Sequence, residues 1–318
     1  MSVLEDIIRK IEAAAGDVRA QAVITAEFAV ALQTESIRER LRAALDAAAV
    51  VRWFDVQLLG RLLEMGEVEA RKRLDALAKL PFLERFPSRD GEVWNVHDAT
   101  RLGWRRRLLK DQPAWFRALS ARAAAFFQKS ASPAERIEWI YHFLSADPER
   151  AADALQDLDR VWNMMGHLED RQALALTLDE LEASGLVSGK ARVEVLLCIA
   201  EARSSREETA RLGAAARTVL ELARSINYQS GLARACSLNG DVLEAQGKLE
   251  AAQAAFGEYL AISQRLAEQD PSNAGWQREL AVAHSRVGDV LEAQGKLEAA
   301  QTAFGEFLAI TRRLAEQI

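Results

Sequence analysis

The sequence predicts a mainly α protein, in which a small helical domain with a β-hairpin precedes an α-solenoid of stacked helical hairpins. Three observations predict this fold class. Two nearly identical segments recur near the C-terminus, helical periodicity runs through most of the 318 residues, and only six prolines interrupt it. The composition, 49% hydrophobic and 28% charged, is typical of a globular protein that buries a sizeable core.

The strongest pattern is an internal repeat with a period of 48 residues. Residues 240–269 and 288–317 are identical at 26 of 30 positions. The four differences are Ala254/Thr302, Tyr259/Phe307, Ser263/Thr311 and Gln264/Arg312. Because these changes are mild, both copies are expected to satisfy the same packing.

Each copy is expected to fold as a helical hairpin. Gly247 breaks the first helix at a tight turn, and the second helix continues until Pro271 stops it. On the second helix, Ala252 is small enough to let the paired helix approach, and Phe256 is large enough to fill the gap behind it. A single hairpin of this kind buries its apolar stripe only by stacking on a neighbour, which predicts an array.

These hairpins resemble the tetratricopeptide (TPR) repeat. The resemblance is carried by Gly240, Gln246-Gly247, Ala252 and Phe256 in one copy and by Gly288, Gln294-Gly295, Ala300 and Phe304 in the other. The period exceeds the 34 residues of the family, which predicts longer helices or a longer connection. Tyr259 and Phe307 stand where the family usually has Ala. The resemblance implies a protein-interaction module over residues 229–318.

Residues 113–228 are expected to hold degenerate TPR-like hairpins. Helical periodicity there is visible over 148–164, 168–183, 187–204 and 206–226. The segment between two of these helices, residues 184–191, contains glycines and Lys190 and is a near match to a phosphate-binding loop. It lacks the first glycine in register and the hydroxyl residue after the lysine, so an ordinary helix connection is expected.

Residues 37–112 are expected to form a winged-helix-like domain, preceded by a helical segment over residues 1–36. Helices are predicted at 37–48, 54–65 and 67–80. Aromatic and β-branched residues over 81–86 and 92–96 then flank a polar turn that contains Asp90-Gly91, which predicts a β-hairpin. Three helices closed by a β-hairpin is the plan of a winged helix.

This region also resembles the winged-helix region of the signal-transduction ATPases with numerous domains (STAND), the class that includes NB-ARC proteins. The resemblance is carried by Leu80-Pro81-Phe82, His97-Asp98 and the helix from Arg101. It implies the regulatory half of a signalling protein, with His97 and Asp98 as a nucleotide-sensing motif. The nucleotide-binding domain of the class is not expected in this chain, so a nucleotide-binding partner protein is implied. The alternative is that His97 only caps the following helix or packs at the strand end.

The candidate binding residues lie on the first helices of the C-terminal hairpins, which are expected to line a concave face. The resemblance to the TPR family implies that they are Arg234, Ser237, Asp241, Glu244, Ser285, Asp289 and Glu292. The acids recur in register from one copy to the next, which favours a basic or amide-rich extended peptide as ligand. The alternative, that these acids only keep the array in solution, stays open.

A second function class is a DNA-binding transcription regulator that uses the repeats as sensor. It depends on Arg71, Lys72 and Arg73, which lie on the helix that a DNA-binding winged helix places in the major groove. Residues 1–130 hold 22 basic and 18 acidic side chains, leaving 19 and 29 for the remainder. This is a small positive excess for phosphate-driven binding, so nucleic acid is the less favoured partner.

No enzyme, cofactor or metal site is predicted, because the four histidines are scattered and no nucleophile motif is present. Cys198 and Cys236 lie in apolar helical patterns and are expected to be buried thiols. The chain has no apolar run of membrane-spanning length and no signal peptide pattern, which predicts a cytoplasmic protein. Self-association is a further expectation, because the last hairpin is not followed by a polar capping helix.

Overall fold

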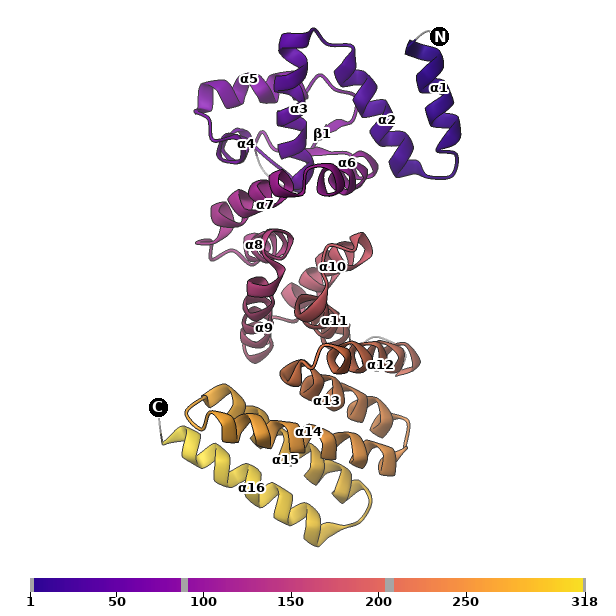
Figure 1. Ribbon diagram of the computed structural model, residues 1–318. Helices are drawn as coiled ribbons and strands as arrows, with labels where there is room; N and C mark the ends of the chain where they lie inside the picture. Colours follow the sequence, from indigo (N-terminus) through magenta and orange to yellow (C-terminus); the bar gives the residue numbers. More distant parts are fainter. Residues whose placement is uncertain (1–2, 87–90, 204–208, 317–318) are drawn as a thin grey trace. The chain divides into compact units, whose positions relative to one another are not determined.

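A computed structural model describes residues 3–86, 91–203 and 209–316 (Figure 1). The described residues form sixteen α-helices and one two-stranded sheet, so the prediction of a mainly α protein is confirmed. The chain divides into two compact units, Met1–Ala151 with Ala183–Leu186 and Ala152–Glu182 with Val187–Ile318. Over the described ranges, no helix combines the length and the apolar character that crossing a membrane requires.

The first unit contains eight helices and the sheet. Its elements are α1 (Val3–Ala13), α2 (Val18–Ala31), α3 (Glu35–Val50), α4 (Val56–Leu63), α5 (Glu67–Leu77), β1 (Leu83–Arg85), β2 (Trp94–Val96), α6 (Asp98–Asp111), α7 (Pro113–Phe127) and α8 (Pro133–Ala146). The three helices expected before the hairpin correspond to α3, α4 and α5. The winged-helix assignment of residues 37–112 stays a prediction.

The two strands pair antiparallel, as the sequence predicts, with Leu83 opposite Val96 and Arg85 opposite Trp94. Phe54 extends this pairing through an isolated bridge to Trp94. The guanidinium of Arg85 lies 4.4 Å from the centre of the Trp94 ring, a distance typical of a cation–π interaction. The predicted turn residues 87–90 lie outside the described residues.

The helices α7 and α8 pack in the first unit. The assignment of residues 113–228 to degenerate TPR-like hairpins stays a prediction. Aromatic side chains of α7 contribute to the packing in the first unit. Phe116 and Phe127 are buried, and Phe127 packs edge-on against Trp53 with 5.4 Å between ring centres. The carboxylate of Glu138 on α8 then accepts hydrogen bonds from the side chains of both Arg52 and Trp53.

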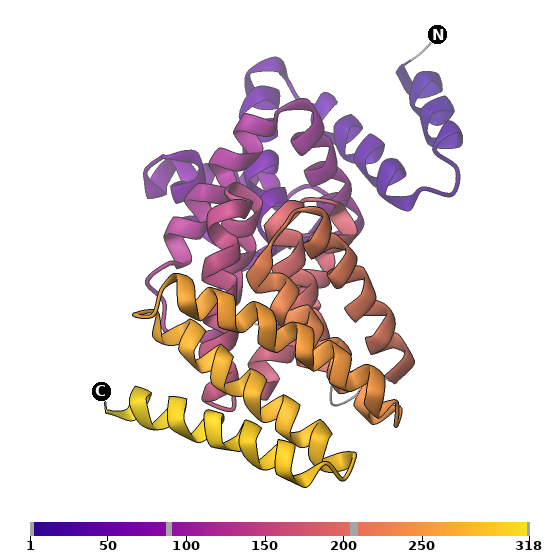
Figure 2. The same cartoon turned by 60° about the horizontal axis from the view of Figure 1, so that its bottom comes forward.

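The second unit is a row of helical hairpins. Its helices are α9 (Pro148–Met164), which enters the unit at residue 152, α10 (Leu168–Ser184), α11 (Gly189–Arg203), α12 (Thr209–Ser225), α13 (Gln229–Ala245), α14 (Leu249–Gln269), α15 (Ala274–Ala293) and α16 (Leu297–Ala315). From α11 onward each helix packs on the next one in the sequence. Figure 2 shows the last four helices, in orange to yellow, side by side with alternating direction.

In both copies of the repeat, a glycine of the first helix packs against a phenylalanine of the second. A Cβ on Gly240 would lie 2.4 Å from the Phe256 ring, and one on Gly288 would lie 2.5 Å from the Phe304 ring. The phenyl ring therefore occupies the space that the missing side chain leaves. Gly247 ends α13 with a φ of +71°, a left-handed conformation that favours glycine at a helix end.

The long period of the repeat is explained by long helices. The helices α14 and α15 have 21 and 20 residues, and only a few residues join each helix to the next. Tyr259, which stands where the TPR family usually has Ala, donates a hydrogen bond to the Glu279 carboxylate at 2.7 Å. The additional residues of the two helices and Tyr259 thus take part in the contact between α14 and α15.

We expect Gly240→Ala to lower the free energy of unfolding by about 1–3 kcal/mol, because the new methyl group overpacks the Phe256 ring. Gly257→Ala is the matched control, since a Cβ at Gly257 meets nothing within 4 Å. That change should stabilise the protein by roughly 0.5–1 kcal/mol through helix propensity. Urea denaturation followed by circular dichroism measures both. Equal effects of the two substitutions would show that the glycine–phenylalanine contact is not required.

Candidate functional site

A cavity of about 550 Å³ lies within the second unit. Side chains from seven helices, α9 to α15, line it. Its charged residues are Asp159, Arg160, Arg171, Glu201, Arg234, Asp241, Glu279 and Arg286. Four arginines thus face four carboxylates, with an apolar wall that includes Leu212, Val242 and Val282. A cavity of this size with a few convergent polar groups is typical of a ligand-binding site.

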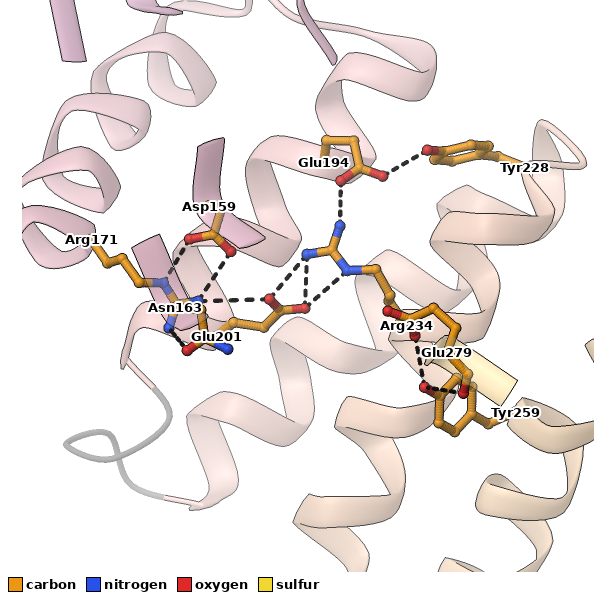
Figure 3. Close-up of polar contacts among 9 residues, drawn as sticks. All are labelled: Asp159, Asn163, Arg171, Glu194, Glu201, Tyr228, Arg234, Tyr259 and Glu279. Atoms are coloured by element: carbon orange, nitrogen blue, oxygen red, sulfur yellow. Dashed lines mark hydrogen bonds and ion pairs between the residues drawn. The ribbon is translucent and has the colours of Figure 1, made fainter. Parts of the chain in front are cut away.

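The central side chain is Arg234, which reaches from α13 toward α11 (Figure 3). Its Nη2 atom donates to both carboxylate oxygens of Glu201, at 2.9 and 3.0 Å. Its Nη1 atom donates to Glu194, whose second oxygen accepts from the Tyr228 hydroxyl at 2.8 Å. Only 14% of the Arg234 side chain is exposed, so two acids from one helix hold a largely buried cation.

A second arginine joins the same cluster from α10. Arg171 donates through Nε and Nη2 to the two oxygens of Asp159, at 2.7 and 3.0 Å, and through Nη1 to the Asn163 amide oxygen at 2.7 Å. Its Nη2 also lies 3.8 Å from Glu201. Glu201 is therefore shared between Arg171 and Arg234, and it connects α9 and α10 to α13 through α11 (Figure 3).

The protonation states follow from this arrangement. Burial works against the charge of Arg234, but Glu201 and Glu194 hold the pKa of its guanidinium well above its ordinary value. Burial raises the pKa of Glu201, and Arg234 opposes that shift. Burial and Glu194 also raise the pKa of Tyr228, so its hydroxyl stays a hydrogen-bond donor. The two arginines of the cluster therefore carry a positive charge, and the neighbouring carboxylates compensate that charge.

On the other side of the cavity, the charged side chains are more loosely paired. Asp241 on α13 lies 3.3 Å from Arg286 on α15, which is long for a charge-assisted hydrogen bond. Burial raises the pKa of Asp241, Arg286 opposes this effect, and Glu244 and Asp289 add to it. Three neighbouring acids therefore interact with each other, and Arg286 compensates them only in part.

The seven predicted binding residues divide into two groups. Arg234, Ser237 and Asp241 line the cavity. The other four, Glu244, Ser285, Asp289 and Glu292, do not line it. Glu244, Ser285 and Asp289 are half-buried, and Glu292 is exposed. The helix α15 instead contributes Glu279, Val282 and Arg286 to the lining.

Sequence reasoning missed the contribution of α9 to α11. The available signal was a charged residue inside a buried apolar pattern. Asp159 follows Leu155 and Leu158 on the inner face of α9, and Glu194 lies between Val193 and Val195 and is only 1% exposed. Because a buried charge requires a partner, such positions indicate an ion pair or a binding site.

The residues of the predicted nucleotide-sensing motif lie elsewhere, in the first unit. His97 occupies the N-cap position of α6, and its side chain makes no capping hydrogen bond. Asp98 begins the helix and accepts a hydrogen bond from Arg101 at 3.2 Å. His97 and Asp98 are both exposed. Residues 184–191, the near match to a phosphate loop, connect α10 to α11, and Lys190 pairs with Asp153.

The three basic residues of the DNA-binding alternative each have an acidic neighbour. Arg71 forms an ion pair with Glu92, and Lys72 and Arg73 lie 3.6 and 3.0 Å from Glu69. These carboxylates reduce the positive charge that α5 presents to solvent. DNA binding through Arg71, Lys72 and Arg73 stays a prediction.

In the described ranges, no group of three or more His, Cys, Asp or Glu side chains is arranged to hold a metal ion. Cys198 and Cys236 are buried free thiols, and burial raises the pKa of Cys236 to about 12. A thiol with so high a pKa is a poor nucleophile.

Comparison with known proteins gives only distant similarities. No family model and no curated protein matches the chain. Among solved structures, BtubC (BKLC) from P. vanneervenii has 17% sequence identity and a TM-score of 0.45, over 67% of this chain and 88% of that chain. MamA has 17% identity and a TM-score of 0.39, over 61% and 96%.

A third solved structure is the STAND protein with a tetratricopeptide repeat sensor from Pyrococcus horikoshii. It has 13% identity and a TM-score of 0.36, and the match covers 94% of this chain and 56% of that chain. All three similarities are too low to assign a function to this chain.

We expect Arg234→Met to lower the free energy of unfolding of the second unit by about 3–5 kcal/mol, because it removes the cation of Glu194 and the closer of the two cations of Glu201 in a buried cluster. The matched control is Arg224→Met, since Arg224 pairs with Glu258 at an exposed position. That change should cost no more than about 1 kcal/mol. Chemical denaturation compares the two. Similar losses for both variants would contradict a special role for Arg234.

Proposed function

We propose that this chain is a non-catalytic protein-interaction scaffold, whose second unit binds a protein or peptide in the cavity between α9 and α15. One observation carries the proposal. The cavity is lined by donors and acceptors from seven helices, and a buried ion-pair cluster fixes the inner ones. A rigid wall of this kind lowers the ordering cost of binding, because its side chains are already held in place.

The chemistry of the cavity favours an extended segment with a basic side chain. An extended backbone offers alternating N–H and C=O groups, which match lining residues such as Ser237, Asn163 and Arg286. Asp241 lines this side of the cavity and is only loosely paired, and Glu244 and Asp289, which do not line the cavity, add negative charge near it. A Lys or Arg side chain of the ligand would compensate that charge.

For the first unit, we propose the docking role of a winged-helix domain in a STAND-type signalling protein. The order α3, α4, α5, β1, β2, α6 supports this role, as do the exposed positions of His97 and Asp98 at the start of α6. These two residues would contact a nucleotide-binding partner protein.

Titration of ATP into the purified chain should give no heat of binding. Tight ATP binding by the chain alone would contradict the proposal.

The alternative function is DNA-binding transcription regulation. It is the weaker candidate, because each of Arg71, Lys72 and Arg73 has a carboxylate within ion-pair distance. Titration with duplex DNA at low salt distinguishes the two functions. A steep, salt-dependent association that Arg71→Ala weakens would favour the alternative.

We expect peptides selected on the purified chain from a random display library to be enriched in Lys and Arg. Asp241→Asn should weaken the binding of such a peptide about tenfold, equivalent to about 1.4 kcal/mol, because it removes the acid nearest the basic side chain. The matched control is Glu250→Gln, an exposed acid on α14 that does not line the cavity. Isothermal titration calorimetry measures the affinities.

Two results would contradict this function. One is a selection without enrichment in basic residues, and the other is an equal loss of affinity in Asp241→Asn and Glu250→Gln. In either case the cavity would not be the binding site for a basic segment.

The binding of a basic peptide should also depend on pH. Because burial raises the pKa of Asp241, this carboxylate takes up a proton at a higher pH than an ordinary aspartate. A cationic ligand favours the ionised form, so its affinity should fall as the pH is lowered through the raised pKa. Calorimetry over the acidic range measures this dependence, and Asp241→Asn should flatten it. A wild-type affinity that does not change with pH would exclude the participation of Asp241.

A further inference from the structure

Arg286 on α15 contacts Asp241 on α13 through both terminal nitrogens of its guanidinium. Its Nη1 atom lies 3.3 Å from Oδ1, and its Nη2 atom lies 3.4 Å from Oδ2. Two nitrogens thus face two oxygens, which is the arrangement in which a guanidinium pairs with a carboxylate. Both distances exceed the value of about 2.7–2.9 Å that is typical of a strong pair. The carboxylate of Asp241 is therefore oriented for a guanidinium but holds Arg286 only weakly.

A second arginine of the same cavity shows what a firmly held pair looks like here. Arg234 donates to the two oxygens of Glu201 at 2.9 and 3.0 Å, and only 14% of its side chain is exposed. By contrast, 40% of Arg286 and 36% of Asp241 are exposed. Water can therefore solvate both charges when they separate, so the pair between Arg286 and Asp241 can open at low cost.

The guanidinium of Arg286 acts on the inside of the cavity. Burial and Glu279 raise the pKa of the Tyr259 hydroxyl, and the charge of Arg286 opposes this shift. Tyr259, Asp241 and Arg286 all line the cavity, together with Val282, which precedes Arg286 by one helical turn and is 43% exposed. A long basic side chain could lay its methylene groups on this valine and place its charge at Asp241.

The internal repeat shows that the helical hairpin does not require an arginine at this position. In the register of the repeat, 48 residues earlier, the position of Arg286 is occupied by Leu238 on α13. Asp241 and Asp289 also correspond to each other in this register. Because one copy has a buried leucine where the other has Arg286, the contribution of the arginine lies in its contact with Asp241.

We propose that the ligand of the cavity binds through an arginine side chain, whose guanidinium takes the place of Arg286 on Asp241. This inference rests on the proposed function and narrows its basic residue to arginine. A planar guanidinium can pair with both oxygens of the carboxylate, whereas the ammonium group of a lysine is a single point of charge. The displaced Arg286 then turns toward Asp289, three residues further along the same helix. Two cations thereby face the three acids Asp241, Glu244 and Asp289, which Arg286 alone compensates only in part.

The test uses the peptide that binds the purified wild-type chain most tightly after selection from a random display library. Replacing its key arginine by lysine should weaken the binding about tenfold, because the second hydrogen bond to Asp241 is lost. Arg286→Gln should strengthen the binding of the arginine peptide about three- to fivefold, since the ligand no longer displaces a resident cation. In the Asp241→Asn background, the same change should have no effect. Isothermal titration calorimetry measures each affinity.

The matched control is Arg160→Gln. Arg160 also lines the cavity, is 46% exposed and pairs with Asp157 at 2.6 Å. This change removes the same charge from the cavity wall without freeing Asp241, so it should strengthen the binding less than Arg286→Gln does. Circular dichroism checks that each variant is folded.

Three results would each overturn this inference. They are equal affinities of the lysine and arginine peptides, no gain of affinity in Arg286→Gln, and equal gains in Arg286→Gln and Arg160→Gln. If one of them occurs while Asp241→Asn still weakens the binding, the proposed function holds and only the exchange of arginines is wrong. A wild-type chain that selects no basic peptide would overturn both.

Discussion

The second unit depends on one carboxylate, Glu201, that two arginines from different helical hairpins share. A buried guanidinium is tolerated only when its hydrogen bonds and its charge are satisfied. Arg234 meets this requirement with Glu201 and Glu194, and Arg171 meets it with Asp159 and Asn163. The two sets meet at Glu201. As a result α9, α10, α11 and α13 keep one relative arrangement, and the cavity keeps its inner wall.

The repeat supplies the opposite wall by a different physical means. The helices α13 to α16 hold together through apolar packing, with a phenyl ring seated on a glycine in each hairpin. This contact has no charge and needs no partner from elsewhere, so the chain can use it twice with almost the same residues. The cavity lies where the polar, non-repeated helices meet the repeated ones, which combines fixed charges with a regular helical surface.

The repeated helices and the β-hairpin could be predicted from the sequence. Of the polar cluster, only a few residues could be predicted. The duplication predicts two equivalent helical hairpins and the turn at Gly247, but not the contact between Gly240 and Phe256. The β-hairpin could be predicted from its alternating pattern. The pairing of Arg171 with Asp159 and of Arg234 with Glu194 could not, because these partners lie 12 and 40 residues apart. Helical periodicity shows which face is inward but not which buried charges meet.

The measurement that tests the cavity as binding site most directly is site-specific photo-crosslinking in the cell from which the chain comes. A photoreactive amino acid replaces Val282, which is 43% exposed in the cavity wall, or Leu176, which is 68% exposed and does not line the cavity. The proposed function predicts a discrete crosslinked product from position 282 and none from position 176. Crosslinks from both positions alike, or from position 176 alone, would contradict the assignment of the cavity as the interaction site.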